Sequence, residues 1–319
     1  MTTTGLPEVQ GETGYTAHPP RMGFFTDTSV CIGCKACEVA CKEWNRLPAD
    51  QPSGFTGMSF DNTVELSAST WRHVAFVEQR ADGDLRWLMA SDVCKHCTDA
   101  ACLNVCPTGS LLRTEFGSVV VQPDVCNGCG YCVSACPYGV IGKREDDGLA
   151  WKCTLCHDRQ VDGLTPACAK ACPTESIQFG PLDELLERAE ARVRRLREDG
   201  VTEARLYGHD PADGVRGNGA FFLLLDDPEV YGLPPAPKDT TRDLPRMWRC
   251  MAAATLTLAA GVAASFAAGA LPALRARRPV RGGLLDHRLL RARRPVLDGI
   301  PARRLVLSGL RALRRPADH

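Results

Sequence analysis

The sequence lacks the local signatures of substrate chemistry. It has no G-x-G-x-x-G loop between a strand and a helix, no phosphate-binding P-loop and no Ser/His/Asp pattern that would mark a hydrolase. Its N-terminus, MTTTGLPEVQGETGYTAHPPRMGFF, has neither a basic start nor an apolar run, so no signal peptide is visible. We therefore expect no catalytic site in this chain, and we expect synthesis in the cytosol, where thiols stay reduced or bind metal.

Cysteine is what the sequence has in excess. Seventeen of its 319 residues are cysteines; sixteen fall into four tight groups of four, and Cys250 stands apart. The groups are Cys31, Cys34, Cys37, Cys41; Cys94, Cys97, Cys102, Cys106; Cys126, Cys129, Cys132, Cys136; and Cys153, Cys156, Cys168, Cys172. A disulfide framework belongs to small secreted domains, and a zinc site usually takes its ligands from two separate CxxC knuckles. Neither accounts for runs as dense as CNGCGYCVSACP.

The spacing within the groups is typical of 4Fe–4S ferredoxins. The third group reads CxxCxxCxxxCP, a run in which three cysteines ligate one cluster and the fourth ligates a neighbouring cluster. The second group has a longer third gap, the first has Lys42 in place of the proline, and the fourth has eleven residues between its second and third cysteines. The sixteen thiols therefore predict four 4Fe–4S clusters.

Reciprocal exchange of the fourth cysteine predicts which thiols share a cluster. The second and third groups are neighbours in the chain, so we expect them to exchange their last cysteines. The first and fourth groups then exchange theirs by elimination. The predicted sets are Cys94, Cys97, Cys102 with Cys136; Cys126, Cys129, Cys132 with Cys106; Cys31, Cys34, Cys37 with Cys172; and Cys153, Cys156, Cys168 with Cys41.

Basic residues inside these loops allow more than one interpretation. Each group already supplies its full set of thiols, so His96 and His157 are expected to have loop or hydrogen-bonding roles and not to ligate iron. Lys35, Lys95 and Lys152 adjoin cluster cysteines. They either raise reduction potentials by offsetting negative charge or are solvated loop lysines, and the sequence favours neither interpretation.

The chain is predicted to be α+β around the cysteine region. A leader rich in Thr, Gly and Pro covers residues 1–23, and the cysteine region covers 24–180 with an insertion at 42–93. Three groups end in similar runs that begin at their last cysteine: CPTGSL, CPYGVI and CPTESI. This similarity indicates one repeated supersecondary unit. Hairpins are expected at Asp82-Gly83, around Gly117, and at EDDG before Trp151.

A helix and a strand are predicted to follow, over residues 181–226. The helix has Pro181 in its first turn and Gly200 at its end, and AFFLLLD at 220–226 is the buried strand. The apolar face of the helix consists of Leu182, Leu185, Leu186, Ala189, Val193 and Leu196. Five prolines within 227–247 predict a linker over 227–250.

An uncharged run and a basic tail end the chain. Residues 251–274 carry no charge, and 24 residues suffice for a transmembrane helix, although eleven are alanine and a buried Ala-rich helix is the alternative. Gly261, Ser265 and Gly269 form a stripe suited to packing on another membrane helix. Residues 275–319 carry 13 arginines and three aspartates, so we expect a disordered or lipid-bound tail. The tail has no aromatic residue to stack on bases, and no nucleic acid partner is expected.

These motifs resemble a known family. The runs FFTDTSVCIGCKACEVACKEWN, SDVCKHC, WKCTLC and ACAKACPTESIQFG are similar to the iron–sulfur (beta) subunit of formate dehydrogenase, one of the four-cluster subunits of molybdopterin oxidoreductases. The order of the four groups and the apolar C-terminal segment add to this resemblance, which covers residues 22–250. The tail from residue 275 departs from it.

The resemblance implies two ferredoxin-like modules side by side. They would relay electrons from a molybdenum- or tungsten-pterin catalytic subunit to a membrane cytochrome b or another acceptor. Relatives in nitrate reductases replace one ligand with tryptophan, whereas every position here is cysteine. The alternatives are the equivalent subunit of another molybdopterin reductase or a membrane hydrogenase, a free polyferredoxin, and a nucleic-acid-binding sensor of iron or oxygen.

The expected location is the cell membrane, through residues 251–274. Basic residues are almost equally frequent just before and just after this segment, which leaves either orientation open. The full tail favours a cytoplasmic C-terminus and hence clusters on the outer face.

Overall fold

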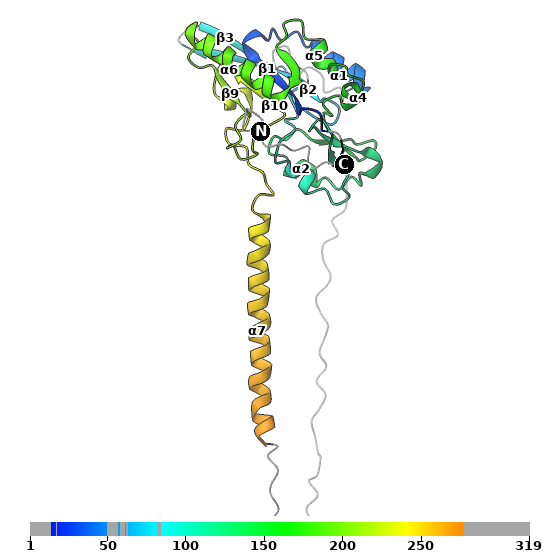
Figure 1. Ribbon diagram of the computed structural model, residues 1–319, viewed down its shortest axis with the longest axis vertical. Coiled ribbons are helices and arrows are strands. Elements are labelled where there is room, and N and C mark those ends of the chain that lie inside the picture. The colour runs from blue at the N-terminus through cyan, green and yellow to red at the C-terminus, as the bar shows by residue number, and fades with distance from the viewer. Residues whose placement is uncertain are drawn as a thin grey trace, which may run out of the picture. The chain divides into compact units, whose positions relative to one another are not determined.

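The computed structural model describes residues 14–16, 18–49, 57, 61, 63–81 and 84–276. The chain separates into two compact units, a body that ends at Ala254 and a second unit that begins at Thr255 (Figure 1).

A four-stranded mixed sheet pairs the first strand of the body with strands from late in its sequence. Its order is β8-β1-β10-β9, so β1 (Met22–Asp27), the first strand, lies between β8 (Ile177–Pro181) and β10 (Ala220–Leu224). β1 pairs with β8 in antiparallel and with β10 in parallel orientation, and β9 (Arg205–Tyr207) covers the other edge of β10. All five residues of β10 are buried, as expected for a strand with a partner on each side.

Helix α6 (Leu182–Glu198) packs on this sheet with the predicted face. All six apolar residues that define the face are buried, and they form a cluster with Phe25 and Phe221, whose rings stack with centroids 5.4 Å apart. Pro181, predicted in the first turn, is the residue just before the helix. Gly200 follows the helix end with φ of 91°.

Three antiparallel hairpins lie where the sequence predicts them. β2 (Arg72–Ala81) pairs with β3 (Asp84–Val93), and the turn residues Asp82 and Gly83 between them lie outside the described residues. β4 (Leu111–Arg113) pairs with β5 (Val119–Val121) across Gly117. β6 (Gly142–Lys143) pairs with β7 (Ala150–Trp151).

Short helices connect these strands and form two pairs. α1 (Ala36–Asn45) packs with α5 (Ala167–Lys170), and α2 (Ala101–Asn104) packs with α3 (Tyr131–Ala135). Figure 1 shows α1, α4 (His157–Val161) and α5 together, with α2 in a separate region of the body. The 3-10 turns η2 (Thr28–Val30) and η3 (Pro123–Val125) each lead directly into the first cysteine of a group.

The predicted leader and linker differ from the structure. Residues 1–13 and 17 lie outside the described part, but Met22 and Gly23 of the leader already belong to β1, and Arg21 is buried. Within the linker, η4 (Pro228–Tyr231) packs on the body: Tyr231 and Leu233 are buried with Leu88, Tyr207 and Phe222. The prolines prevent a regular helix there, but the apolar side chains between them still have surface to bury.

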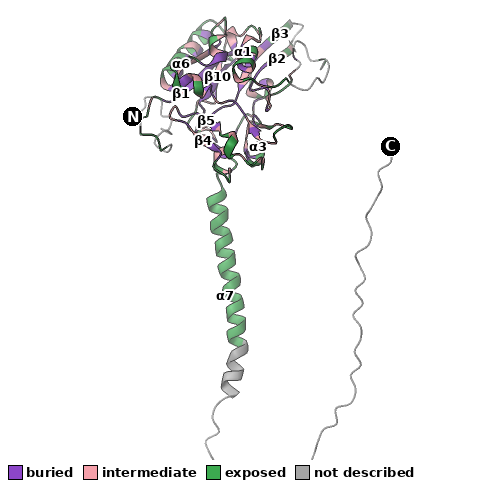
Figure 2. Ribbon diagram, turned by 90° about the vertical axis from the view of Figure 1, so that its right-hand side faces the viewer, coloured by how far each residue is buried: buried purple, intermediate pink, exposed green. Residues whose placement is uncertain are grey.

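The C-terminal helix is longer than predicted. α7 runs from Leu244 to Ala276 rather than over 251–274, and Pro245 fits its first turn because the missing N–H needs no partner there. Its described side chains are all exposed, as Figure 2 shows. Of the described helices, it alone is long and apolar enough to cross a membrane. Residues 277–319 of the predicted tail lie outside the described residues.

Candidate metal centres

All seventeen cysteines are free thiols in the structure. Two tight turns bring the first cysteines of a group together in CIGC and CNGC. Their glycines, Gly33 and Gly128, have φ of 65° and 69°, a conformation that strains any residue with a Cβ. A Cβ on Gly128 would lie 2.4 Å from the carbonyl oxygen of Gly148, and one on Gly33 would lie 2.6 Å from the ring of Phe76. Both turns therefore require glycine.

A short helix carries the third cysteine of each group. In α2, α3 and α5 a Cys-Pro step follows the helix, and proline disfavours helical backbone at the residue before it, so the helix ends by the fourth cysteine. α1 has Lys42 in place of the proline, so it continues to Asn45 and keeps Cys37 and Cys41 one turn apart. The departure of the first group from the repeat thus explains its longer helix.

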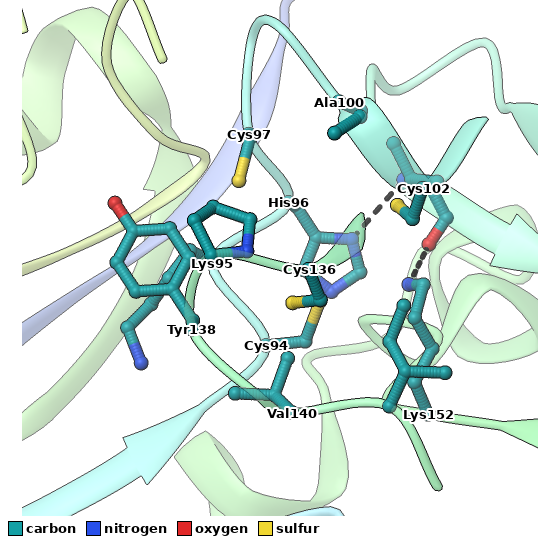
Figure 3. A pocket seen from close by; sticks show the side chains of 14 residues that line it. Cys94, Lys95, His96, Cys97, Ala100, Cys102, Cys136, Tyr138, Val140 and Lys152 are labelled. Atoms are coloured by element: carbon teal, nitrogen blue, oxygen red, sulfur yellow. Dashed lines mark hydrogen bonds between the residues drawn. The ribbon is translucent and has the colours of Figure 1, made fainter. Parts of the chain in front are cut away.

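One cavity collects four thiols from two groups. Cys94, Cys97, Cys102 and Cys136 line about 340 Å³ of empty space (Figure 3). We call these four residues the Cys94 set. Burial, which is the largest cause, and the neighbouring thiols of Cys94 and Cys136 together raise the pKa of Cys102 to about 12. Four thiols this close repel one another as thiolates, so the set favours a cationic metal centre.

Basic side chains also line this cavity. Lys152, which is 1% exposed, donates to the carbonyl oxygens of Val119 and Cys153. Burial opposes its charge, but the electrostatic effect of Cys94 and then Cys102 outweighs burial, and the pKa of Lys152 is raised. His96 is buried, and its Nδ1 accepts from the backbone N–H of Val119 at 3.1 Å, so the neutral ring carries its proton on Nε2.

The Nε2 atom of His96 is buried without a hydrogen-bond partner among the described residues. Figure 3 shows the ring pointing into the space between the labelled cysteines. A buried donor without an acceptor is costly, so an anionic, sulfur-rich group in this cavity would satisfy it. The four thiols, the lysine and this N–H together fit a 4Fe–4S cluster.

A second cavity, of about 290 Å³, is lined by Cys31, Cys34, Cys37 and Cys172, the Cys31 set. Cys34 is exposed, so this set reaches the surface. The hydroxyl of Thr174 lies 3.8 Å from the sulfur of Cys172. The repeat in the sequence places Thr108 equivalently, 3.6 Å from the sulfur of Cys106.

The remaining thiols gather in two further sets. Burial raises the pKa of Cys41, and the thiols of Cys153, Cys168 and Cys156 raise it further, which places these four together as the Cys153 set. Burial and then the thiols of Cys126, Cys106 and Cys129 raise the pKa of Cys132 to about 11, which defines the Cys126 set. Two cavities and these electrostatic effects therefore group four thiols from two cysteine groups into each set.

Electrostatic effects between thiols of different sets indicate which sets are neighbours. Cys168 of the Cys153 set acts on Cys37 of the Cys31 set. Cys94 is the thiol with the largest effect on Cys153, and Cys132 acts on Cys102. Linked through these neighbours, the sets follow the order Cys31 set, Cys153 set, Cys94 set and Cys126 set.

Comparisons with known proteins agree with this arrangement. Residues 30–110 and 85–182 each match a family profile described as a 4Fe–4S dicluster domain. The nitrate-inducible formate dehydrogenase iron–sulfur subunit of Escherichia coli (strain K12) is 42% identical over 246 residues, which cover 76% of this chain and 80% of the relative. The formate dehydrogenase iron–sulfur subunit of Haemophilus influenzae is 41% identical over 225 residues, 69% of this chain and 71% of the relative.

This chain belongs to the family of formate dehydrogenase iron–sulfur subunits. The predicted resemblance is confirmed. A more distant kind of relative, a component of the anaerobic dimethyl sulfoxide reductase of Escherichia coli (strain K12), is 40% identical over 168 residues, 53% of this chain and 77% of the relative. Two dicluster domains give this iron–sulfur subunit four 4Fe–4S clusters, and its function is electron transfer.

Most of the other residues that the sequence singled out now have a structural role. His157 contacts Glu115 through Nε2 at 2.9 Å. Lys95 is buried, pairs with Asp92 and lies over the ring of Tyr138, so the solvated interpretation is wrong for it and for Lys152. Lys35 is partly exposed and pairs with carboxylates of Asp61 and Glu38. Cys250 is exposed on α7.

Sequence reasoning missed two residues in the insertion. Arg72, the first residue of β2, is 1% exposed and donates to the sulfur of Cys168 at 3.3 Å. Ser91 of β3 lies with its hydroxyl 3.3 Å from the sulfur of Cys37. The alternation of the strand could have predicted the burial of Arg72. Residues two apart in a strand lie on the same face, and Val74 is buried, so Arg72 lies on the inward face as well.

Proposed function

We propose that each of the four sets of thiols holds one 4Fe–4S cluster. The supporting observation is that four thiols from two separate groups meet in every set, and that two of the sets line cavities. The cluster, when bound, supplies one-electron transfer. The protein's own residues fix the positions of the thiols, exclude water from the interior sets, and supply buried positive charge at Lys95 and Lys152.

The row of sets suggests where electrons enter and leave. The Cys31 set and the Cys126 set are the ends of the row, and each contains an exposed cysteine, Cys34 and Cys129 respectively. The two interior sets contain Cys41, Cys94, Cys153 and Cys168, which are all buried. Electrons would therefore be exchanged with partners at the two end sets, while the interior sets pass electrons between them.

The proposed donor is a formate-oxidising, pterin-bearing catalytic subunit. The match to formate dehydrogenase subunits extends over 76% of this chain, against 53% for the component of dimethyl sulfoxide reductase. Both relatives are parts of larger oxidoreductases, as their names state. The iron–sulfur subunit would bind such a partner at one end of the row and deliver electrons to a membrane cytochrome b or another acceptor at the other.

Helix α7 is proposed to anchor the subunit in the cell membrane. Its described side chains are exposed and apolar over a length that suffices to span a bilayer, and such a surface is stable in lipid and not in water. Gly261 and Ser265 lie one turn apart, and the Ser265 hydroxyl donates to the carbonyl oxygen of Gly261 at 2.9 Å, which keeps this face narrow enough for another membrane helix. The basic tail favours a cytoplasmic C-terminus, with clusters on the outer face.

The test is to purify the native complex anaerobically from membranes in mild detergent. Its subunits are identified by mass spectrometry, its iron and sulfide are counted, and formate-dependent dye reduction is assayed. We expect four clusters in this chain, a pterin-bearing large subunit and formate activity. A different large subunit would keep the electron-transfer function but contradict the donor, and extraction without detergent would contradict the anchor.

A further inference from the structure

A buried arginine lies between two sets of thiols. Arg72 is 1% exposed, and among the described residues its guanidinium has hydrogen bonds to Ser91 and Cys168 but no carboxylate partner. Its Nη2 donates to the sulfur of Cys168 at 3.3 Å, and its Nη1 donates to the carbonyl oxygen of Ser91 at 3.2 Å and to the Ser91 hydroxyl at 3.3 Å. The guanidinium also lies 4.8 Å from the ring centroid of Phe24.

The same contacts reach the neighbouring set. The hydroxyl of Ser91 lies 3.3 Å from the sulfur of Cys37. A hydrogen-bonded path therefore runs from Cys37 through Ser91 and Arg72 to Cys168, and its two ends belong to the Cys31 set and the Cys153 set. Val74 pairs with Ser91 and Arg72 pairs with Val93, so both polar residues lie on the face of the hairpin that is turned to the thiols.

Charge balance explains how the arginine remains buried. Burial opposes the guanidinium charge, so this cation needs negative charge close to it in the folded protein. Its contacts lead to both sets, directly to Cys168 and through the Ser91 hydroxyl to Cys37, so a negatively charged group held by either set would compensate the cation. Its Nε–H is also buried and has no partner in the described structure, so a third donor remains for an anionic group.

We propose that Arg72, positioned by Ser91, is a shared electrostatic bridge that raises the reduction potentials of two neighbouring clusters together. This inference rests on the proposed assignment of clusters to the Cys31 and Cys153 sets. When an electron moves between them, one cluster is oxidised and the other reduced by one electron, no bond forms or breaks, and no proton moves. A cation and hydrogen bonds at the thiolates favour the reduced, more negative state of each cluster. Because one guanidinium serves both, neither cluster becomes an electron trap relative to the other.

The experiment compares midpoint potentials in the full complex. All four clusters are titrated by EPR in the unaltered protein and in Arg72→Gln, Arg72→Lys and Ser91→Ala variants. The matched control is Arg86→Gln, because Arg86 lies on the same hairpin and has its own partners, Asp226 and the carbonyl oxygen of Leu225. Iron and sulfide are counted in each sample before the titration.

We expect Arg72→Gln to lower two of the four potentials together. The equilibrium constant for reduction of each should fall about tenfold, which is about 59 mV for one electron. Arg72→Lys keeps the charge and should shift the same two by less, and Ser91→Ala should shift one of them by less than threefold. Arg86→Gln should shift none.

Several results would overturn the bridge. They are equal shifts of all four clusters, a shift of one cluster alone in Arg72→Gln, or no difference between Arg72→Gln and the Arg86→Gln control. If Arg72→Gln fails to assemble its clusters, the lysine and serine variants decide: unchanged potentials in both contradict the proposal. Fewer than four clusters in the unaltered protein would instead refute the proposed function, so the two failures are distinguishable.

Discussion

The Cys94 set and the Cys126 set are built from neighbouring segments that exchange a cysteine, yet their surroundings differ. Cys97 of the Cys94 set has its pKa raised well above the ordinary value, first by burial and then by neighbouring thiols. At Cys106 of the Cys126 set, by contrast, burial is outweighed by backbone N–H donors at Leu111 and by the hydroxyl and N–H of Thr108, so its pKa is lowered.

This difference shows how one repeated motif produces centres of two kinds. In the Cys94 set the protein stabilises negative charge with buried residues from elsewhere in the chain, such as Lys152 and His96. In the Cys126 set it uses local backbone donors and solvent. Hydrogen bonds and charge interactions are stronger when they are buried, because the local dielectric is low. Substitutions near the Cys94 set should therefore change reduction potentials more than substitutions near the Cys126 set.

The largest expected effect is on the interior set itself. Cys136→Ser should remove or convert the cluster of the Cys94 set while the Cys126 set keeps its cluster, because Cys136 lines the cavity of the former. Electron transfer along the row should fall by more than about 100-fold, since an interior step is lost, as measured by formate-dependent reduction of the membrane acceptor. Cys250→Ser is the control, because Cys250 is exposed on α7 and belongs to none of the sets. Selective loss of the Cys126 cluster in the EPR spectrum would refute the assignment.

Removal of iron tests whether the sets are part of the core. Thiols of all four sets belong to one buried cluster with Phe24, Trp71 and Ile141. Chelation under reducing conditions should therefore cost at least about 5 kcal/mol, as much as the stability of many whole domains. Circular dichroism melts of the loaded and iron-free protein would measure this, and equal melting temperatures would contradict it.

The iron-free protein should also have a specific pH dependence. Folding raises the thiol pKa to about 11 at Cys37 and Cys132 and to about 12 at Cys102, above the value of about 8.5 in an unfolded chain. The folded state then holds these protons more tightly, so stability is retained below about pH 8.5 and is lost as the pH rises towards 11. Melting temperatures of the iron-free protein at pH 7, 9 and 10 should therefore fall in that order, and a rise would contradict the assignment of these thiols to buried sites.

The sequence contains enough to predict the cysteine sets but not what surrounds them. Spacing, prolines and turn glycines are local signals, so the four groups, the three hairpins and the inward face of α6 follow from them. The burial of Arg72 depends on Cys168, ninety-six positions away, and local patterning cannot supply that compensation. The parallel pairing of β1 with β10 and the docking of Tyr231 depend on equally distant contacts.

Substitution of His96 is expected to have an intermediate effect, on the reduction potential of one cluster. Its Nε2–H is a buried donor that lines the cavity of the Cys94 set, and a hydrogen bond to a cluster sulfur raises the reduction potential. His96→Phe keeps a ring of similar size and should lower the equilibrium constant for reduction of one cluster about tenfold, the equivalent of one hydrogen bond to a charged group. EPR titration measures this. An unchanged potential with four clusters present would show that the N–H does not reach the cluster.

The smallest expected effect is at Thr108, in the Cys126 set. Its hydroxyl lies 3.6 Å from the sulfur of Cys106, so Thr108→Val removes a donor at nearly constant volume, as His96→Phe does in the interior. Here backbone donors remain and solvent replaces the lost hydroxyl, so the equilibrium constant for reduction should fall by less than about twofold. Thr174→Val repeats the test at Cys172 of the other end set. The contrary outcome is that either threonine variant shifts the reduction potential of its cluster as much as His96→Phe does. Exposure to solvent would then not explain a difference between the end sets and the interior sets. The local hydrogen bonds that the repeat supplies would then control the potentials throughout the row.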